Sequence, residues 1–264
     1  MPDAKKEDAL ILYSGGKDSF LCACRAIQDY GMRAVLLSCN GGTIWGEENL
    51  SHGVARLRNR YGKDSAVFAG SASTAAIIQR LNEAWIYEPW SDLARSYPDV
   101  RNVQINCLHC QTAMWVAAVA YAEAKKIGTV LAGYKHADPF CTGIPGWASA
   151  MRGMADRRGI QAIFPLWEMP EWGEDQDAGR DEDMARRGFQ PQVLEPKCLL
   201  GRPSGKPGEA EEAQILEYFR SRIEPAVQEL IDRMIPIYAN IRLSENSLSM
   251  LRYPDPGPDG SGIY

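Results

Sequence analysis

The chain has 264 residues, of which 45% are hydrophobic and 24% are charged, which is ordinary usage for a globular protein. No apolar run approaches the roughly 18 residues of a membrane-spanning helix, and the N-terminal segment lacks the order of a signal peptide, so we expect a cytoplasmic protein. The net charge of −5 disfavours a protein that grips nucleic acid through a broadly basic face, although a local basic patch on an acidic protein is not excluded.

The first half of the chain alternates between apolar runs typical of buried strands and segments with helical spacing. In chain order, the predicted elements are a strand at 8–14, a helix at 18–30, a strand at 33–39, a helix at 50–61, a strand at 65–69 and a helix at 73–87.

The second half continues the alternation and then becomes helical. The predicted elements are an alanine-rich helix at 111–126 stopped by Gly128, strands at 129–133 and 160–164, an acidic surface loop or lid at 168–183, a loop at 201–208, and a mainly helical segment at 209–238 interrupted or restarted at Pro225 and Pro236. This order predicts the α/β class, with a doubly wound, mainly parallel sheet. We expect one domain over 1–200, a helical extension over 201–250 and a mobile tail over 251–264.

A glycine-rich hexapeptide, Ser14-Gly15-Gly16-Lys17-Asp18-Ser19, joins the first strand to the first helix. Paired glycines permit a tight turn and a close approach to a ligand, and the start of the following helix attracts phosphate. Ser14 and Ser19 can donate hydroxyl hydrogen bonds and Lys17 adds a positive charge. Asp18 repels phosphate, so we interpret it as a ligand of a bridging magnesium ion. The alternative is an ordinary strand–turn–helix connection.

The hexapeptide resembles the signature of the PP-loop ATP pyrophosphatases, also called adenine nucleotide alpha hydrolases, and the resemblance extends over residues 8–165. It implies a Rossmann-like fold of the HUP type, and cleavage of ATP between the α and β phosphates. AMP then passes to a substrate oxygen and pyrophosphate leaves, with Lys17 and Asp18 as catalytic residues.

The resemblance also implies where the rest of the nucleotide site lies. The end of the second strand, with Ser38, is expected on the adenine side. The segment LAGYKHAD at 131–138 would complete the site through Gly133, His136 and Asp138. Several tRNA-modifying members have paired histidines in this loop, and Tyr134 and Lys135 depart from that pattern.

Cys107 and Cys110 form a CxxC pair that we expect at the start of the helix predicted at 111–126, where the helix dipole favours thiolates. A CxxC pair alone is a zinc half-site, a redox pair or a coincidence. Together with the glycine loop and the distant Cys198, it resembles the iron–sulfur-dependent tRNA thiolation enzymes of the superfamily. That resemblance implies a [4Fe–4S] cluster held by Cys107, Cys110 and Cys198. Cys141, near the nucleotide loop, is a further candidate ligand or catalytic nucleophile.

Three alternatives remain for these cysteines. They bind zinc with His109 as a fourth ligand, or two of them form a nucleophile and its resolving partner, or all are buried thiols. Cys22, Cys24 and Cys39 are predicted to belong to the core.

The leading hypothesis is an ATP-dependent sulfurtransferase acting on a tRNA base or on a small-molecule thioamide or thio-base, with an unidentified sulfur donor. The first rival is an amide ligase of the diphthamide-synthase type, whose members also carry SGGKDS and a later Pro-Leu-Trp segment, as at 165–167 here. The second rival is a nucleotide-binding protein without turnover. By resemblance to the cluster-bearing enzymes, we expect a homodimer.

Overall fold

The computed structural model describes residues 6–41, 44–45, 49–82, 90–172, 175–191, 197–198 and 205–240. The predicted tail at 251–264, the end of the helix predicted at 73–87 and part of the loop at 201–208 lie outside these residues. None of the described helices is both long enough and apolar enough to cross a membrane.

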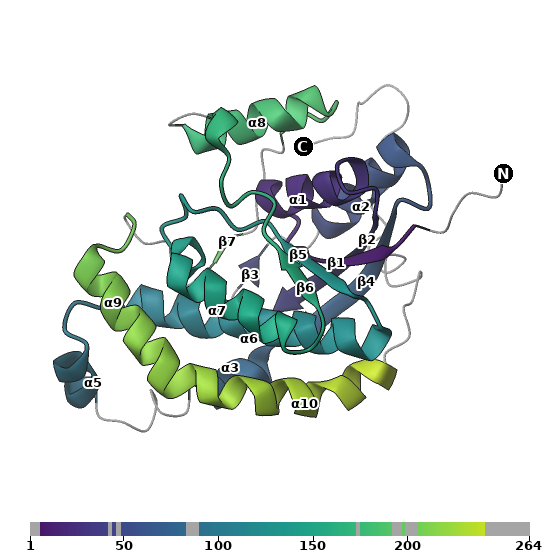
Figure 1. The fold of residues 1–264 in the computed structure, drawn as a ribbon. Helices are drawn as coiled ribbons and strands as arrows, with labels where there is room; N and C mark the ends of the chain where they lie inside the picture. The colour runs from purple at the N-terminus through teal and green to yellow at the C-terminus, as the bar shows by residue number, and fades with distance from the viewer. Residues whose placement is uncertain are drawn as a thin grey trace.

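The first half of the described chain alternates strands and helices (Figure 1), with β3 and α5 in addition to the predicted elements and with β4 four residues longer at its end than the predicted strand. Its elements are β1 (Asp8–Leu12), α1 (Lys17–Gln28), β2 (Arg33–Asn40), β3 (Ile44–Trp45), α2 (Asn49–Tyr61), β4 (Ala66–Ser73), α3 (Ala75–Leu81) and α5 (Trp90–Ser96).

The second half is richer in helix and ends in a long helical segment. Its elements are α6 (Asn102–Lys125), β5 (Thr129–Ala132), the short 3₁₀ helix η1 (Cys141–Gly143), α7 (Pro145–Asp156), β6 (Gln161–Ile163), the 3₁₀ helix η2 (Pro170–Trp172), α8 (Gln176–Arg186), β7 (Lys197–Cys198), α9 (Glu209–Tyr218), the π-helical segment η3 (Phe219–Ile223) and α10 (Glu224–Asn240).

Five strands form one parallel sheet in the order β4-β2-β1-β5-β6, which confirms the predicted doubly wound α/β class. The chain builds outward from β1 to β2 and β4 on one side, and then to β5 and β6 on the other. The strand order therefore reverses between β1 and β5, and ligands of such sheets bind at the carboxyl ends of the strands at this point. β3 and β7 form a separate antiparallel pair.

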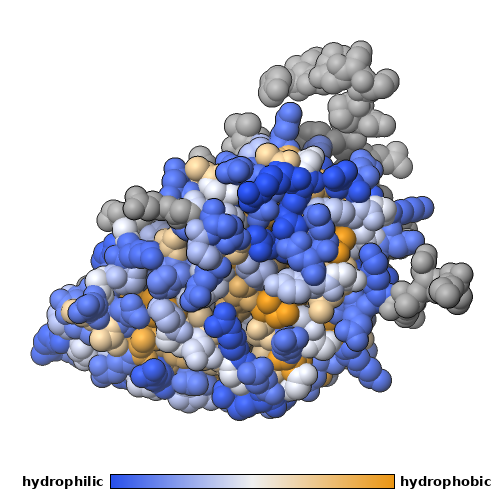
Figure 2. All heavy atoms as spheres, turned by 45° about the horizontal axis from the view of Figure 1, so that its top comes forward, coloured by the Kyte–Doolittle hydropathy of each residue, from blue (hydrophilic) through white to orange (hydrophobic). Residues whose placement is uncertain are grey.

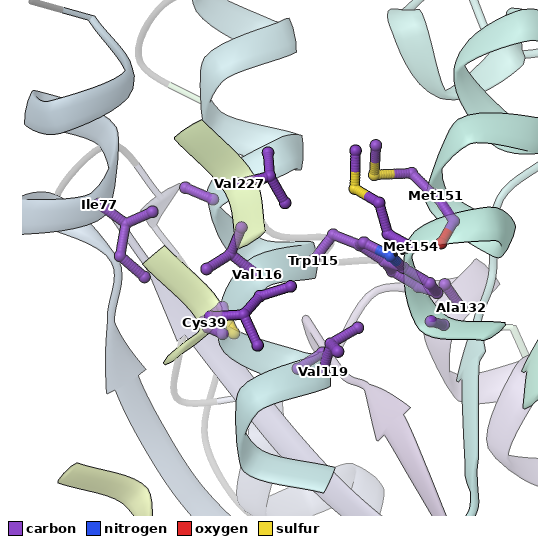
Figure 3. Packing of buried hydrophobic residues seen from close by; sticks show 14 of the residues in the cluster. Cys39, Ile77, Trp115, Val116, Val119, Ala132, Met151, Met154 and Val227 are labelled. Carbon is purple, nitrogen blue, oxygen red and sulfur yellow. Dashed lines mark hydrogen bonds between the residues drawn. The ribbon is translucent and has the colours of Figure 1, made fainter. Parts of the chain in front are cut away.

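Both faces of the sheet are covered, as expected for parallel strands. Along β1, Leu10 belongs to one hydrophobic core, whereas Ala9 and Ile11 belong to the other. The core that includes Leu10 also contains α6, α7 and the C-terminal helices, and the opposite core contains α1, α2 and Met184 of α8. Figure 3 shows Trp115 of α6 beside Met151 and Met154 of α7, and its indole Nε1 donates to the Met151 carbonyl oxygen at 2.9 Å.

The alanine-rich helix α6 is longer than predicted, because it begins at Asn102 and not at residue 111. Ile105, Leu108 and Thr112 are buried at helical spacing, so the buried stripe continues towards the N-terminus through the CxxC segment. The predicted stop at Gly128 is also wrong in detail. Lys126 takes the left-handed conformation with φ of 57°, and its N–H bonds to the carbonyls of the last turn.

The acidic segment predicted as a loop or lid at 168–183 includes most of the helix α8, which continues to Arg186. The Asp175 carboxylate caps this helix by accepting hydrogen bonds from the N–H groups of Asp177 and Ala178. The sequence of α8 is mostly polar and shows no apolar stripe that would predict a helix. Ion pairs to other elements hold α8 in place.

The C-terminal segment continues through both prolines. Residues 209–240 run through α9, η3 and α10, and Pro236 lies inside α10 without ending it. Pro225 follows the π-helical segment, whose wider turn accommodates a residue that cannot donate the regular backbone bond. Tyr218, Ile223 and Val227 are buried in the same core as α6, so this extension is an integral layer of the described fold.

Candidate nucleotide site

The predicted phosphate loop forms a tight turn between β1 and α1, at the carboxyl edge of the sheet. Gly15 has a φ of 81°, a conformation that favours glycine. The Ser19 hydroxyl donates to the Gly16 carbonyl at 3.0 Å and accepts from the Ser14 N–H at 3.2 Å. The Ser14 and Ser19 hydroxyls lie 3.1 Å apart. These hydrogen bonds hold the backbone of the loop in one conformation at the start of α1, without a bound ligand.

Gly133 lies directly against this loop. A Cβ atom at Gly133 would lie 2.6 Å from the Asp18 carbonyl oxygen and 3.0 Å from the Ser19 nitrogen. Only a residue without a side chain lets β5 end this close to the first turn of α1. The two segments that the sequence assigned to one nucleotide site are therefore in contact.

Lys17 and Asp18 belong to an ionic network that connects three segments. The Lys17 ammonium lies 2.9 Å from an Asp181 carboxylate oxygen. The Asp18 Oδ1 atom lies 3.2 Å from both the Lys135 ammonium and the Arg180 guanidinium. The predicted magnesium ligand is thus paired with two cations in this structure, and its role as a metal ligand stays a prediction.

α8 supplies the other half of the network. Asp177 lies 3.1 Å from the Lys135 ammonium and 3.0 Å from the Arg180 guanidinium. Arg180 Nε also lies 3.0 Å from Asp181. Lys135 and Arg180 are buried, at 6% and 5% exposure. Burial alone would lower the pKa of Lys135, but Asp18 and Asp138 outweigh it and hold the ammonium pKa above its usual value.

Asp138 lies on the same loop as Lys135. Its Oδ2 atom accepts hydrogen bonds from the Lys135 N–H at 3.2 Å and from the Thr142 hydroxyl at 3.3 Å. Burial raises the pKa of Asp138 to about 6, and Lys135 opposes this shift. Asp138 is therefore a buried carboxyl group with a raised pKa on the loop that follows β5, and its contact with a nucleotide stays a prediction.

The remaining predicted nucleotide residues lie at the same sheet edge. Ser38 is buried near the carboxyl end of β2 and pairs in register with Ser71 of β4. His136 is exposed, and its backbone N–H donates to the Trp167 carbonyl at 3.1 Å. Their contacts with a nucleotide stay predictions.

Two of the four candidate cysteines, Cys107 and Cys141, lie close together in the structure. The Sγ atoms of Cys107 and Cys141 lie 3.9 Å apart, with Cys141 fully buried and Cys107 partly exposed. Cys110 is also partly exposed, whereas Cys198 is exposed on β7, opposite Ile44 of β3. Within the described parts of the chain, no three Cys, His, Asp or Glu side chains are arranged to hold a metal ion. The assignment of Cys107, Cys110 and Cys198 as ligands stays a prediction.

Two expectations about the CxxC segment change with the structure. The pair lies inside α6 and not at its start, so the helix dipole argument for thiolates does not hold there. His109 points into the core, where its Nε2 lies 3.1 Å from the Tyr218 hydroxyl of α9. Burial lowers the pKa of His109 to about 4, which is the behaviour of a neutral core histidine.

The α8 side chains are the part of the site that sequence reasoning missed. The available signal was the spacing of Asp177, Arg180 and Asp181, which places these charges on one face of a helix. Figure 2 shows the α8 end of the molecule turned towards the viewer, with hydrophilic residues gathered over it. Composition alone cannot distinguish such a helix from a solvated loop.

These features define an α/β protein with a five-stranded parallel sheet and a glycine turn that opens the helix after its first strand. No family model matches the sequence, and no curated protein matches it. Among solved structures, the chain is similar to a predicted subunit of a tRNA methyltransferase from Methanocaldococcus jannaschii, at 16% identity and a TM-score of 0.41 over 75% of this chain and 99% of that one. It is also similar to the U34-tRNA thiolase NcsA from Methanococcus maripaludis, solved with its [4Fe–4S] cluster, at 13% identity and a TM-score of 0.41 over 92% of this chain and 77% of that one.

Proposed function

We propose that this protein is a PP-loop ATP pyrophosphatase that adenylates a substrate oxygen and releases pyrophosphate. The observation that carries the proposal is the preformed turn at 14–19, at the point where the strand order reverses, with Gly133 in contact with it. Backbone N–H groups at the start of α1 and the Lys17 ammonium provide a site for the phosphates of ATP.

The chemistry requires little of the protein beyond positioning and charge. The substrate oxygen attacks the α-phosphorus, the bond from that phosphorus to the bridging oxygen breaks, and pyrophosphate leaves with the electron pair. Lys17 and the N–H groups of α1 stabilise the negative charge that grows on the departing phosphates. A magnesium ion bound through Asp18 would neutralise part of the same charge.

We propose sulfur insertion as the second step, on a tRNA base or a small-molecule acceptor. A sulfide-level nucleophile from a separate sulfur donor attacks the carbon that carries the adenylated oxygen, the carbon–oxygen bond breaks, and AMP leaves with that oxygen. The observation that favours sulfur chemistry over amide ligation is the thiol pair Cys107 and Cys141, in which Cys141 lies three residues after Asp138 of the loop that follows β5. The described arrangement of Cys107, Cys110 and Cys198 does not form a complete metal site. No step of the proposed reaction therefore passes through an iron–sulfur cluster.

The products of ATP turnover test the first step. Protein and Mg-ATP labelled at the α-phosphate are incubated with a tRNA fraction or, in parallel, with a small-molecule extract. We expect AMP with pyrophosphate in one fraction, lost in Lys17→Met and kept in the matched variant Lys63→Met, since Lys63 is exposed at a turn. ADP with phosphate would contradict the proposal, and so would turnover that is indifferent to Lys17.

The predicted cluster ligands are tested separately by iron, zinc and sulfide analysis after anaerobic purification. Iron and acid-labile sulfide that disappear in Cys198→Ala would support the cluster at the predicted ligands. Metal-free protein that still releases pyrophosphate would contradict the cluster, and pyrophosphate release that is unchanged in Cys107→Ala and Cys141→Ala with no sulfur in the product would make amide ligation the better candidate.

A further inference from the structure

Three cations from three separate segments converge beside the glycine turn. Lys17 lies in the first turn of α1, Lys135 follows β5, and Arg180 lies on α8. Lys135 and Arg180 share Asp18 Oδ1 at 3.2 Å each. Long cationic side chains that are almost fully buried need anionic partners, and here Asp177 and Asp181 of α8 complete the set.

We propose that Lys135 and Arg180 complete the phosphate site with Lys17, and that the Asp177 and Asp181 carboxylates occupy these cations until the phosphates of ATP replace them. The inference rests on the proposed function and names further phosphate-binding residues for it. The incoming ligand is a polyphosphate chain, and the exchange swaps ionic partners without forming or breaking a covalent bond.

The charges of the network fit such an exchange. Lys17, Lys135 and Arg180 form ion pairs with Asp18, Asp177 and Asp181, and Asp138 adds a fourth carboxylate beside Lys135. Asp177 and Asp181 are the two carboxylates of the network that α8 contributes. Their side chains are 60% and 32% exposed, so both can rotate into solvent. Once they do so, Asp18 and Asp138 are the carboxylates that still act on Lys135, and the three cations leave a net positive site for phosphate oxygens.

α8 is held in place by contacts that do not involve the site. Asp183 lies 2.6 Å from Arg25 of α1 and 3.1 Å from Arg187, and Arg187 also lies 2.9 Å from Asp29. Burial alone would raise the pKa of Asp183, but Arg25 and Arg187 outweigh it and lower that pKa. Phe189 stacks edge-on against Phe20 of α1 with ring centroids 4.9 Å apart. This anchor keeps Arg180 at the site while the neighbouring carboxylates turn away.

The test is equilibrium titration with Mg-α,β-methylene-ATP, for the wild type and two variants with opposite expected effects. Asp181→Asn removes a competing anion, so we expect binding about two- to fivefold tighter, the range for a partly exposed ion pair. Arg180→Ala removes a charged hydrogen-bond donor, so we expect binding at least about tenfold weaker. Glu182→Gln is the matched control, because Glu182 is exposed on the same helix and its ion pair is with Arg186.

The opposite expected changes in affinity distinguish an effect on binding from an effect on folding, because damage to α8 would weaken binding in both variants. Tighter binding by Asp181→Asn with weaker binding by Arg180→Ala supports the inference, and any other pattern overturns it. Inorganic tripolyphosphate is titrated in parallel. If the wild type binds tripolyphosphate with this variant pattern but does not bind the ATP analogue, the proposed function fails and the anion site stands. If the wild type binds neither probe, both fail.

Discussion

The contact between Gly133 and the glycine turn makes Gly133→Ala a sharp perturbation of the candidate site. The added Cβ would lie 2.6 Å from the Asp18 carbonyl oxygen, whereas ordinary van der Waals contact begins at 3.4 Å. The end of β5 and the start of α1 must therefore separate by roughly 0.8 Å, the difference between those distances. Both partners are backbone, so no side chain can rotate to relieve the contact. Overpacking of this kind costs about 1–3 kcal/mol.

Each 1 kcal/mol lowers the melting temperature of a domain of this size by about 2–4 °C, so we expect Gly133→Ala to melt about 2–12 °C below the wild type. Displacing the turn should also weaken ATP-analogue binding by about tenfold or more, which corresponds to about 1.4 kcal/mol. Gly128→Ala is the control, because a Cβ at Gly128, just before β5, meets nothing within 4 Å. Thermal melting followed by circular dichroism and an analogue titration measure the two effects. If Gly133→Ala matches Gly128→Ala in both, the close approach is not what positions the turn.

Three further predictions concern the histidine and the thiols. Burial lowers the pKa of His109 to about 4 in the folded chain, against about 6.5 in the unfolded chain. The neutral His109 therefore leaves the free energy of unfolding unchanged above pH 6.5, and that free energy falls by about 3 kcal/mol as the pH falls from 6.5 to 4. Urea unfolding at pH 7 and pH 4.5 should show a smaller pH effect in His109→Gln, and equal effects would contradict this burial. Burial raises the pKa of Cys24 to about 12 and so disfavours its reactive thiolate. Alkylation of the native protein, followed by mass spectrometry, should therefore label the exposed Cys198 before Cys24. Equal labelling rates for the two cysteines would be inconsistent with the structure. The mild oxidant diamide should link Cys107 to Cys141, whose Sγ atoms lie 3.9 Å apart, and a mixture dominated by other pairs would refute their proximity.

The fold class follows from patterns that are visible in the sequence. Apolar runs such as 33–39 lie between segments with helical spacing, and parallel strands buried on both faces produce just such runs. The glycine turn at 14–19 also follows from local residue types, whereas Gly133 is implied only by the family resemblance. The sequence does not determine how far β5 extends relative to the start of α1. The close approach of Gly133 to Asp18, where an added Cβ would lie 2.6 Å from the carbonyl oxygen, is therefore clear only from the structure.

The missed parts of the site share a physical reason. α8 has almost no apolar face, because it is held by ion pairs such as Asp183 with Arg25, and periodicity methods detect only apolar stripes. The pairing of Lys135 and Arg180 around Asp18 joins residues far apart in the chain. In α6, the apolar positions before residue 111 are sparse, so the buried stripe through Ile105 and Leu108 is clear only in three dimensions.

The central claim is that ATP binds through the turn at 14–19 and the loop at 133–138. Amide hydrogen exchange with and without saturating Mg-α,β-methylene-ATP, read by mass spectrometry of overlapping peptides, tests it most directly. We expect increased protection in the peptides that cover these two segments, with little change in the C-terminal helices at 209–240. Protection confined to other segments, or no change anywhere at saturating analogue, would contradict it.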